Sequence, residues 1–165
     1  ISPFLLIIKS TNETGKTFIS NSKLKVNYFS KFVNFSVISD DSGLCIKSLN
    51  NKPGVYSARL AKKKGGFTNA MKYLLKKLEK KKNRSATFIC CLSFKSPNQK
   101  IINVVGQIKG TISKEILGKK GFGYDPIFIP TNRRKTFGEI PKFKKMKMDH
   151  RFIAFRKLKK RVKIL

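Results

Sequence analysis

The sequence predicts an α/β fold, and three observations lead to that class. Segments 18–32 and 68–78 repeat apolar residues three or four positions apart, which is the period of an amphipathic helix. Segments 86–94 and 101–108 are rich in β-branched and aromatic residues, and a Ser-Pro-Asn-Gln turn separates them, so they are expected to pair as an antiparallel hairpin. Hydrophobic residues make up 40% of the chain and include 14 Phe, which is enough apolar side chain for a folded core.

Shorter elements complete this outline. A strand is expected at Phe4–Ile8 and a second at Ile127–Ile129, and Thr68 is expected to cap the helix that follows it. A helix is also expected at the end of the chain, with its apolar residues on one side: Phe152, Phe155, Leu158, Val162 and Leu165.

The length and the cysteine content limit the class of protein. The 165 residues are sufficient for one domain, 1–165, and no apolar run reaches the roughly 18 residues that a membrane span needs. Cys45, Cys90 and Cys91 are an odd number without metal-ligand spacing, and they are expected to remain reduced thiols. The sequence therefore predicts a cytoplasmic protein.

The charge is extreme, because 38 Lys and Arg stand against 8 Asp and Glu, a formal net charge of +30. Such a balance attracts any polyanion, so one interpretation is a nucleic-acid-binding protein. The other is compositional drift, in which Lys, Asn, Ile and Phe are enriched together. The lysines mark no single face, which favours drift and predicts that nucleic acid binds only non-specifically.

Two adjacent carboxylates lie at the centre of the chain. Val37 and Ile38 are expected to form a short buried strand that ends at Asp40-Asp41-Ser42-Gly43. Neighbouring acids repel each other unless a divalent metal or a basic side chain compensates them. The same residues are also ordinary turn formers, so a simple turn is the alternative.

Four motifs in a fixed order extend this stretch. They are Asp-Asp-Ser-Gly-Leu at 40–44, Pro-Gly-Val-Tyr-Ser-Ala-Arg at 53–59, Gly-Phe-Gly-Tyr-Asp-Pro-Ile-Phe at 121–128, and His150-Arg151. Together they resemble the inosine triphosphate pyrophosphatase family, hydrolases of non-canonical purine nucleoside triphosphates, from about Glu13 to the last helix. The resemblance implies a long mixed β-sheet flanked by helices, two lobes with a nucleotide cleft between them, and a homodimer.

The resemblance also implies an activity and a metal. The activity is hydrolysis of ITP, dITP and XTP to the monophosphate and pyrophosphate with Mg²⁺. Asp41 would be the general base, Glu13 and Asp41 the metal ligands from two separate loops, and Lys25 a phosphate ligand; Glu13 could instead only cap the next helix. The remaining implied substrate-binding residues are Ser42, Phe122, Gly123, Tyr124, Asp125, Lys145, His150 and Arg151.

The chain departs from the family pattern in two places. Asp149 stands where the family has Ser, and it is expected to pair with Arg151. The family also begins with a strand and a Thr/Ser-x-Asn-x-x-Lys loop, which Ile1–Ser10 does not contain, so the domain is expected to be incomplete at its N-terminus. A truncated, catalytically impaired family member and a basic nucleic-acid-binding protein therefore stay as alternatives.

Overall fold

A five-stranded antiparallel sheet organises the computed structural model, which describes residues 12–162. The strand expected at Phe4–Ile8 and the position of Leu165 lie outside these residues. Along the sheet the order is β2-β1-β3-β4-β5. The strands are β1 Val37–Ile46, β2 Lys52–Pro53, β3 Ser85–Lys95, β4 Ile102–Ile112 and β5 Phe128–Pro130.

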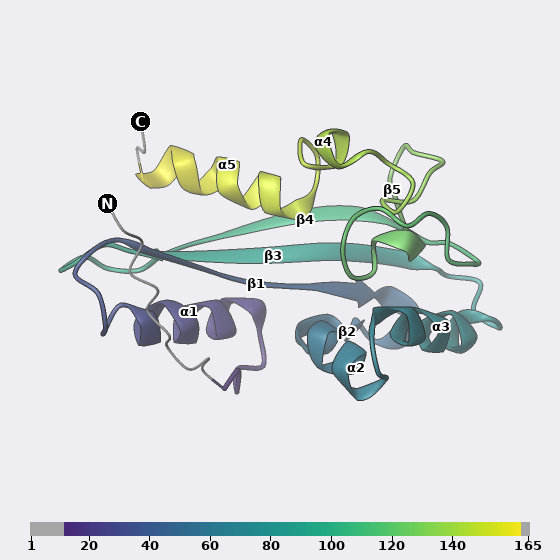
Figure 1. Cartoon of the computed structure of the whole chain (residues 1–165), viewed down its shortest axis with the longest axis horizontal. Coiled ribbons are helices and arrows are strands. Elements are labelled where there is room, and N and C mark those ends of the chain that lie inside the picture. Colours follow the sequence, from purple (N-terminus) through teal and green to yellow (C-terminus); the bar gives the residue numbers. More distant parts are fainter. Residues whose placement is uncertain (1–11, 163–165) are drawn as a thin grey trace.

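Helices cover both faces of this sheet (Figure 1). On one face lie α1 Phe18–Phe29, α2 Ser57–Lys63 and α3 Phe67–Leu78, and on the other α4 Lys142–Lys145 and α5 His150–Val162. The expected class, a long sheet with flanking helices, is confirmed. None of the helices in the described part of the chain is long and apolar enough to cross a membrane.

The strand directions differ from the expected mixed sheet. All four strand pairings within residues 12–162 are antiparallel. A short turn after Lys95 joins β3 to β4, and a tight turn cannot join parallel neighbours. The hairpin itself is confirmed, with Cys90 opposite Gly106.

Strand β1 extends well beyond the expected Val37 and Ile38, so the alternative of a simple turn at residues 40–43 is wrong. Asp40, Asp41 and Ser42 lie within the strand, and Asp41 is paired with Cys91 of β3. Successive side chains of a strand point to opposite faces, and accordingly Asp41 is buried whereas Asp40 is exposed. The strand therefore separates the two carboxylates that are adjacent in the sequence.

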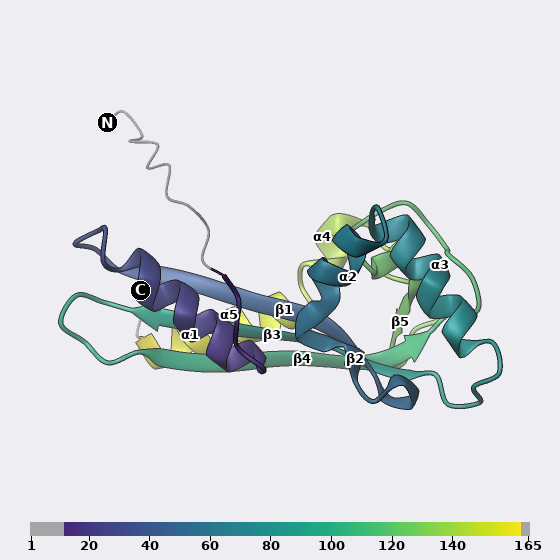
Figure 2. The same ribbon diagram turned by 90° about the horizontal axis from the view of Figure 1, so that it is seen from below.

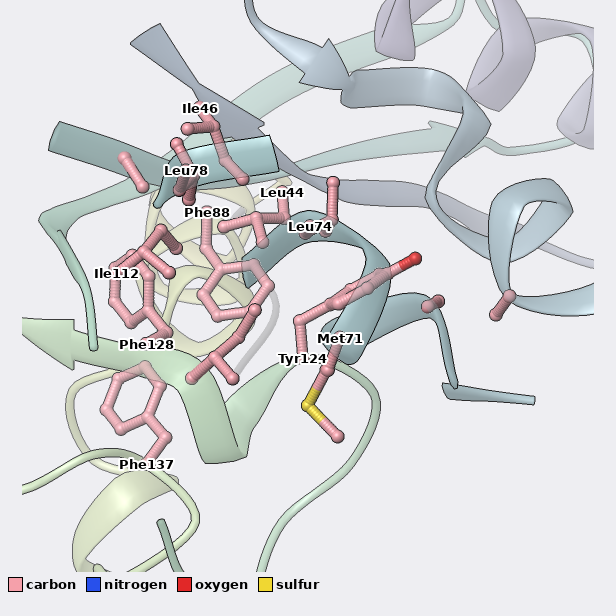
Figure 3. Packing of buried hydrophobic residues seen from close by; sticks show 14 residues of the cluster. Leu44, Ile46, Met71, Leu74, Leu78, Phe88, Ile112, Tyr124, Phe128 and Phe137 are labelled. Atoms are coloured by element: carbon pink, nitrogen blue, oxygen red, sulfur yellow. The ribbon is translucent and has the colours of Figure 1, made fainter. Parts of the chain in front are cut away.

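Two hydrophobic clusters hold the helices to the sheet. The larger one surrounds Leu44, Phe88 and Phe128 and includes buried residues of α3 (Figure 3). The smaller one joins α5 to β3 and β4 through Ala154 and Leu158. Gly106 permits this approach, since a Cβ there would lie 2.2 Å from the carbonyl oxygen of His150.

Some expected details of the helices are wrong. Gly66, not Thr68, is the N-cap of α3, and Thr68 lies within the helix. In α5 the buried side is made by Ala154 and Leu158, while Phe155 is 49% exposed, because the residues that face β4 are set by the close approach at Gly106.

The elements divide into the two expected lobes along the sheet (Figure 2). One end carries α1 and most of α5, and the other carries α2, α3, α4 and β5. Beyond Cys45 and Ile46, the β1 edge facing β2 has no strand partner among the described residues. Residues 40–43 therefore lie at an open edge, from which side chains on both faces of β1 can reach the space between the lobes.

Candidate active site

A cleft of about 220 Å³ lies where the two lobes meet, around the centre of β1. It brings together residues from the loop before α1, from β1, from the segment before β5 and from the start of α5. Every implied site residue lines it, namely Glu13, Lys25, Asp41, Ser42, Phe122, Gly123, Tyr124, Asp125, Lys145, His150 and Arg151.

On one wall, an ammonium group bridges two carboxylates. Lys25 Nζ lies 2.8 Å from Glu13 Oε1 and 3.5 Å from Asp41 Oδ1. Burial alone would lower the pKa of Lys25, but Glu13 and Asp41 raise it above its usual value. Burial raises the pKa of Asp41, and the positive charge of Lys25 and the hydrogen bond from Asn21 oppose that rise. The negative charges of Glu13 and Asp41 are therefore compensated by the ammonium group of Lys25 on α1.

Helix α1 fixes the geometry of this wall. Asn21 is fully buried, and its Nδ2 donates to Asp41 Oδ2 at 3.2 Å, which leaves Oδ1 directed toward Lys25. Thr17 is the N-cap of α1 and forms a capping box with Ser20. Glu13 accordingly does not cap the helix, and its side chain extends to the cleft.

Asp40 takes part in a separate contact on the other face of β1. Its Oδ2 accepts from Ser42 Oγ at 3.0 Å and lies 3.5 Å from Arg151 Nη2. The expected pairing of Asp149 with Arg151 is absent from the described residues. Asp149 instead accepts from the backbone N–H of Phe152 at 2.9 Å, where it stabilises the first turn of α5.

The second wall contains a buried ion pair. Lys145 Nζ lies 2.7 Å from Asp125 Oδ2 and 3.7 Å from Asp149 Oδ2. Asp125 Oδ2 also accepts from the backbone N–H of Phe122 at 2.6 Å. Burial raises the pKa of Asp125, and Lys145 opposes that rise. Asp125 therefore joins Lys145 to the glycine-rich segment that presents Phe122.

His150 is buried, and its imidazole stacks on the ring of Phe88 at 4.8 Å and 8°. Burial, together with the charges of Arg151 and Lys145, lowers its pKa to about 3, so the ring is neutral at pH 7. Arg151 Nη1 lies 3.3 Å from Nε2, and a guanidinium can only donate. The ring proton is therefore on Nδ1, a buried atom without a partner among residues 12–162.

Three aromatic rings border the cleft between the glycines and α3. Phe122 is 68% exposed, and its ring meets that of Phe67 edge to face at 5.1 Å. Gly121 and Gly123 have φ of +81° and +66°, which side-chain-bearing residues rarely adopt. Tyr124 is buried, and its hydroxyl donates to the carbonyl of Ser57 at 2.9 Å, so it packs with the core.

Sequence reasoning missed part of the lining. Phe67 and Phe88 support the rings of Phe122 and His150, and Ser57 Oγ accepts from the backbone N–H of Leu44 at 2.9 Å. A phenylalanine or serine of this kind carries no local signal in the sequence. Asn21, in contrast, stands four residues before Lys25 on one helix face, and the resemblance to the family implies that both side chains point into the cleft.

The carboxylates suit a divalent cation, although residues 12–162 contain no group of three or more His, Cys, Asp or Glu placed to hold a metal. Glu13 and Asp41 come from different segments and both contact the same ammonium group. Their oxygens therefore converge on one position that accepts a cation. Mg²⁺ commonly uses one or two protein carboxylates and takes its other ligands from water and phosphates, so the donor set fits that ion.

Fold and site together define a class: an α/β protein with acids on one wall of a cleft and cations with aromatic rings on the other. Comparison with models of known protein families identifies the family within this class. The model of the Ham1 family matches residues 3–161, and the chain belongs to that family. The family expected from the four motifs is therefore confirmed.

Curated relatives and solved structures agree with this assignment. The dITP/XTP pyrophosphatases of Staphylococcus epidermidis and Bacillus subtilis are each 44% identical to the chain, over 89% and 90% of it and over 75% and 76% of their own lengths. The solved Ham1 protein of Staphylococcus aureus has a TM-score of 0.90 at 36% identity, covering 96% of this chain and 83% of that one. A HAM1 protein from Coxiella burnetii has a TM-score of 0.89 at 32% identity, covering 95% and 82%.

Proposed function

We propose that the chain hydrolyses non-canonical purine nucleoside triphosphates, ITP, dITP and XTP, to the monophosphate and pyrophosphate. The observation that carries this proposal is the single cleft, in which the acids around Asp41 face the polar group at Lys145, His150 and Arg151. Relatives at 44% identity are named dITP/XTP pyrophosphatases, which supports the same activity here. The reaction adds water across the phosphoanhydride that joins the α- and β-phosphates.

Asp41 is assigned the role of general base. Asn21 fixes one oxygen of its carboxylate, and burial raises the pKa of Asp41 above the usual value for an aspartate, which strengthens it as a proton acceptor. It would hold the attacking water and take up its proton. Lys25, 3.5 Å from Asp41 Oδ1, would then be available to the phosphate charge.

Glu13 and Asp41 are the residues that would hold Mg²⁺. When bound, the ion neutralises phosphate charge and lowers the pKa of a coordinated water. When a metal ion binds the carboxylates of Glu13 and Asp41, it would replace the Lys25 ammonium group as their counter-ion. Lys25 would then be free to pair with a phosphate of the substrate.

Recognition of the base is assigned to the opposite wall. Phe122 offers an exposed ring for stacking, which in nucleic-acid complexes contributes about 1–3 kcal/mol per base. Lys145 and Arg151 are donors that line the cleft beside the neutral ring of His150, and a 6-keto oxygen is an acceptor. Adenine carries an amino group at that position and would leave the donors unpaired, which disfavours it.

The remaining proposals concern the cellular compartment and the oligomeric state. All three cysteines are free and buried, which suits a reducing compartment, and we place the protein in the cytoplasm. We also propose a homodimer.

The test measures pyrophosphate release from dITP, with dATP and dGTP as competing substrates and Mg²⁺ as the added metal. Release that favours dITP, requires Mg²⁺ and falls at least about 100-fold in Asp41→Asn is the expected result. The matched control is Glu79→Gln, which removes a carboxylate from an exposed residue that does not line the cleft. Equal losses in both variants, or turnover of dATP as fast as dITP, would contradict the proposal.

A further inference from the structure

A second recessed surface lies outside the cleft, against α4. It is a groove of about 610 Å³ that follows the turn after β5 and the end of α4. The cations in its lining, all exposed, are Arg133, Arg134, Lys135, Lys144 and Lys147.

A neighbouring groove of about 360 Å³ continues this surface along α5. The two share Lys147 and Met148, and the second adds Arg156, Lys157 and Lys160. We call the joined surface the α4–α5 groove. Eight of its fourteen lining residues are Lys or Arg, against 38 of 165 in the chain, so positive charge is concentrated there beyond the general excess.

Protein acids do not neutralise this charge. The one acid in the lining, Glu139, accepts from Thr136 N at 2.8 Å and from Thr136 Oγ1 at 3.1 Å, so it is held within its own loop. Within residues 12–162, none of the eight cations forms an ion pair with a carboxylate; Lys157 Nζ donates to the carbonyl of Val105 at 2.7 Å. The groove is therefore an uncompensated cationic surface.

Apolar side chains lie between the cations. The first groove contains Ile140 and Pro141, and the second contains Phe152 and Ile153, with Met148 common to both. All five are partly shielded from solvent rather than fully exposed, and the Arg156 guanidinium lies 5.8 Å from the centre of the Phe152 ring. A partner that fits this surface carries regularly repeated anions together with flat apolar groups.

The groove and the cleft use different side chains of the same helices. Lys145 and Arg151 line the cleft, whereas Lys144, Lys147 and Arg156 line the groove. A ligand in one site therefore leaves the other accessible.

We propose that the α4–α5 groove binds single-stranded nucleic acid without sequence preference, its phosphates pairing with the cations and its bases lying on the apolar residues. Single strands expose both groups at once, while the bases of a duplex are stacked inside it. Anionic membranes also attract basic surfaces, but here the apolar residues lie within a groove, and a lipid surface requires them to protrude. This binding goes beyond the hydrolysis proposed above and does not depend on it.

The test uses the full chain and a fluorescein-labelled oligothymidylate, with binding followed by fluorescence anisotropy over a salt series. The groove variant combines Arg133→Gln, Arg134→Gln, Arg156→Gln and Lys160→Gln. Affinity at about 0.1 M salt is expected to fall at least 10-fold, and the slope of log K against log salt is expected to decrease by about 3, since each lost phosphate contact on a single strand removes about 0.7.

The matched control removes the same charge from the other side of the sheet, with Lys62→Gln, Lys63→Gln, Lys80→Gln and Lys81→Gln, all exposed. It is expected to change the slope by less than about 1. Equal losses in the two variants would overturn the proposal, because the binding would then follow net charge alone. Preference for the duplex of the same sequence, or for phosphatidylglycerol vesicles over the oligonucleotide, would overturn it as well. The far-ultraviolet circular dichroism spectrum and the urea unfolding midpoint of the groove variant, compared with the wild type, show that it is folded.

Discussion

Stability at acid pH gives the sharpest test of the second wall, because His150 is the single histidine of the chain. Its pKa is lowered to about 3 in the folded protein, whereas an unfolded histidine titrates near 6.5. Above pH 6.5 both states are neutral and the difference has no effect. As the pH falls below 6.5 the unfolded state gains a proton that the folded state does not accept, so stability decreases until about pH 3.

The size of this loss follows from the two pKa values. Between pH 7 and pH 5, linkage gives a decrease of about 2 kcal/mol in the free energy of unfolding. Urea unfolding followed by circular dichroism at pH 7, 6 and 5 measures it. His150→Gln removes the titrating group and serves as the reference, so the contribution of all carboxylates cancels in the comparison.

Two results would refute this reasoning. One is a parallel loss of stability in the wild type and in His150→Gln between pH 7 and 5. The other is direct titration of the imidazole with a pKa above 5, seen in its carbon-bound proton signals by NMR. Either would mean that the stacked position on Phe88 does not exclude the charged form.

Three further predictions concern packing and thiols. Gly106→Ala should destabilise the protein by about 1–3 kcal/mol or more in urea unfolding, because its Cβ would meet the backbone of His150 at 2.2 Å. Tyr124→Phe should cost about 1 kcal/mol, since it removes the hydroxyl that donates to the Ser57 carbonyl at 2.9 Å. The three thiols are buried, and burial raises the pKa of Cys90 to about 11, so a thiol reagent at pH 8 should label them only after unfolding.

Each of the two substitutions has its own control. Lys109→Ala changes an exposed residue on the same strand as Gly106 and should leave stability nearly unchanged. Tyr28→Phe removes the hydroxyl of a tyrosine that is only partly buried and lies outside the hydrophobic core, so it should leave stability nearly unchanged. A neutral effect of Gly106→Ala or Tyr124→Phe would contradict the close packing at Gly106 or the hydrogen bond of Tyr124, and rapid labelling of the native thiols would contradict their burial.

Local patterns were sufficient for much of the fold. The helix at Phe18–Phe29, the helix at Phe67–Leu78 and the hairpin of β3 and β4 were predicted within a few residues, because periodicity and turn residues depend on near neighbours. The strand containing Asp41 was predicted too short. Asp, Ser and Gly are turn formers by local preference, and pairing with β3 over ten residues overrides that preference.

By itself, the sequence determined the family, the amphipathic elements and many, though not all, of the residues that line the cleft. The tertiary structure decided how those residues interact. Asp40 and Asp41 are neighbours in the chain, yet β1 directs one to Arg151 and the other to Asn21 and Lys25. Asp149 pairs with Lys145 and the helix backbone rather than with Arg151. Such partners come from elements far apart in the chain, and only strand register and helix packing bring them within bonding distance.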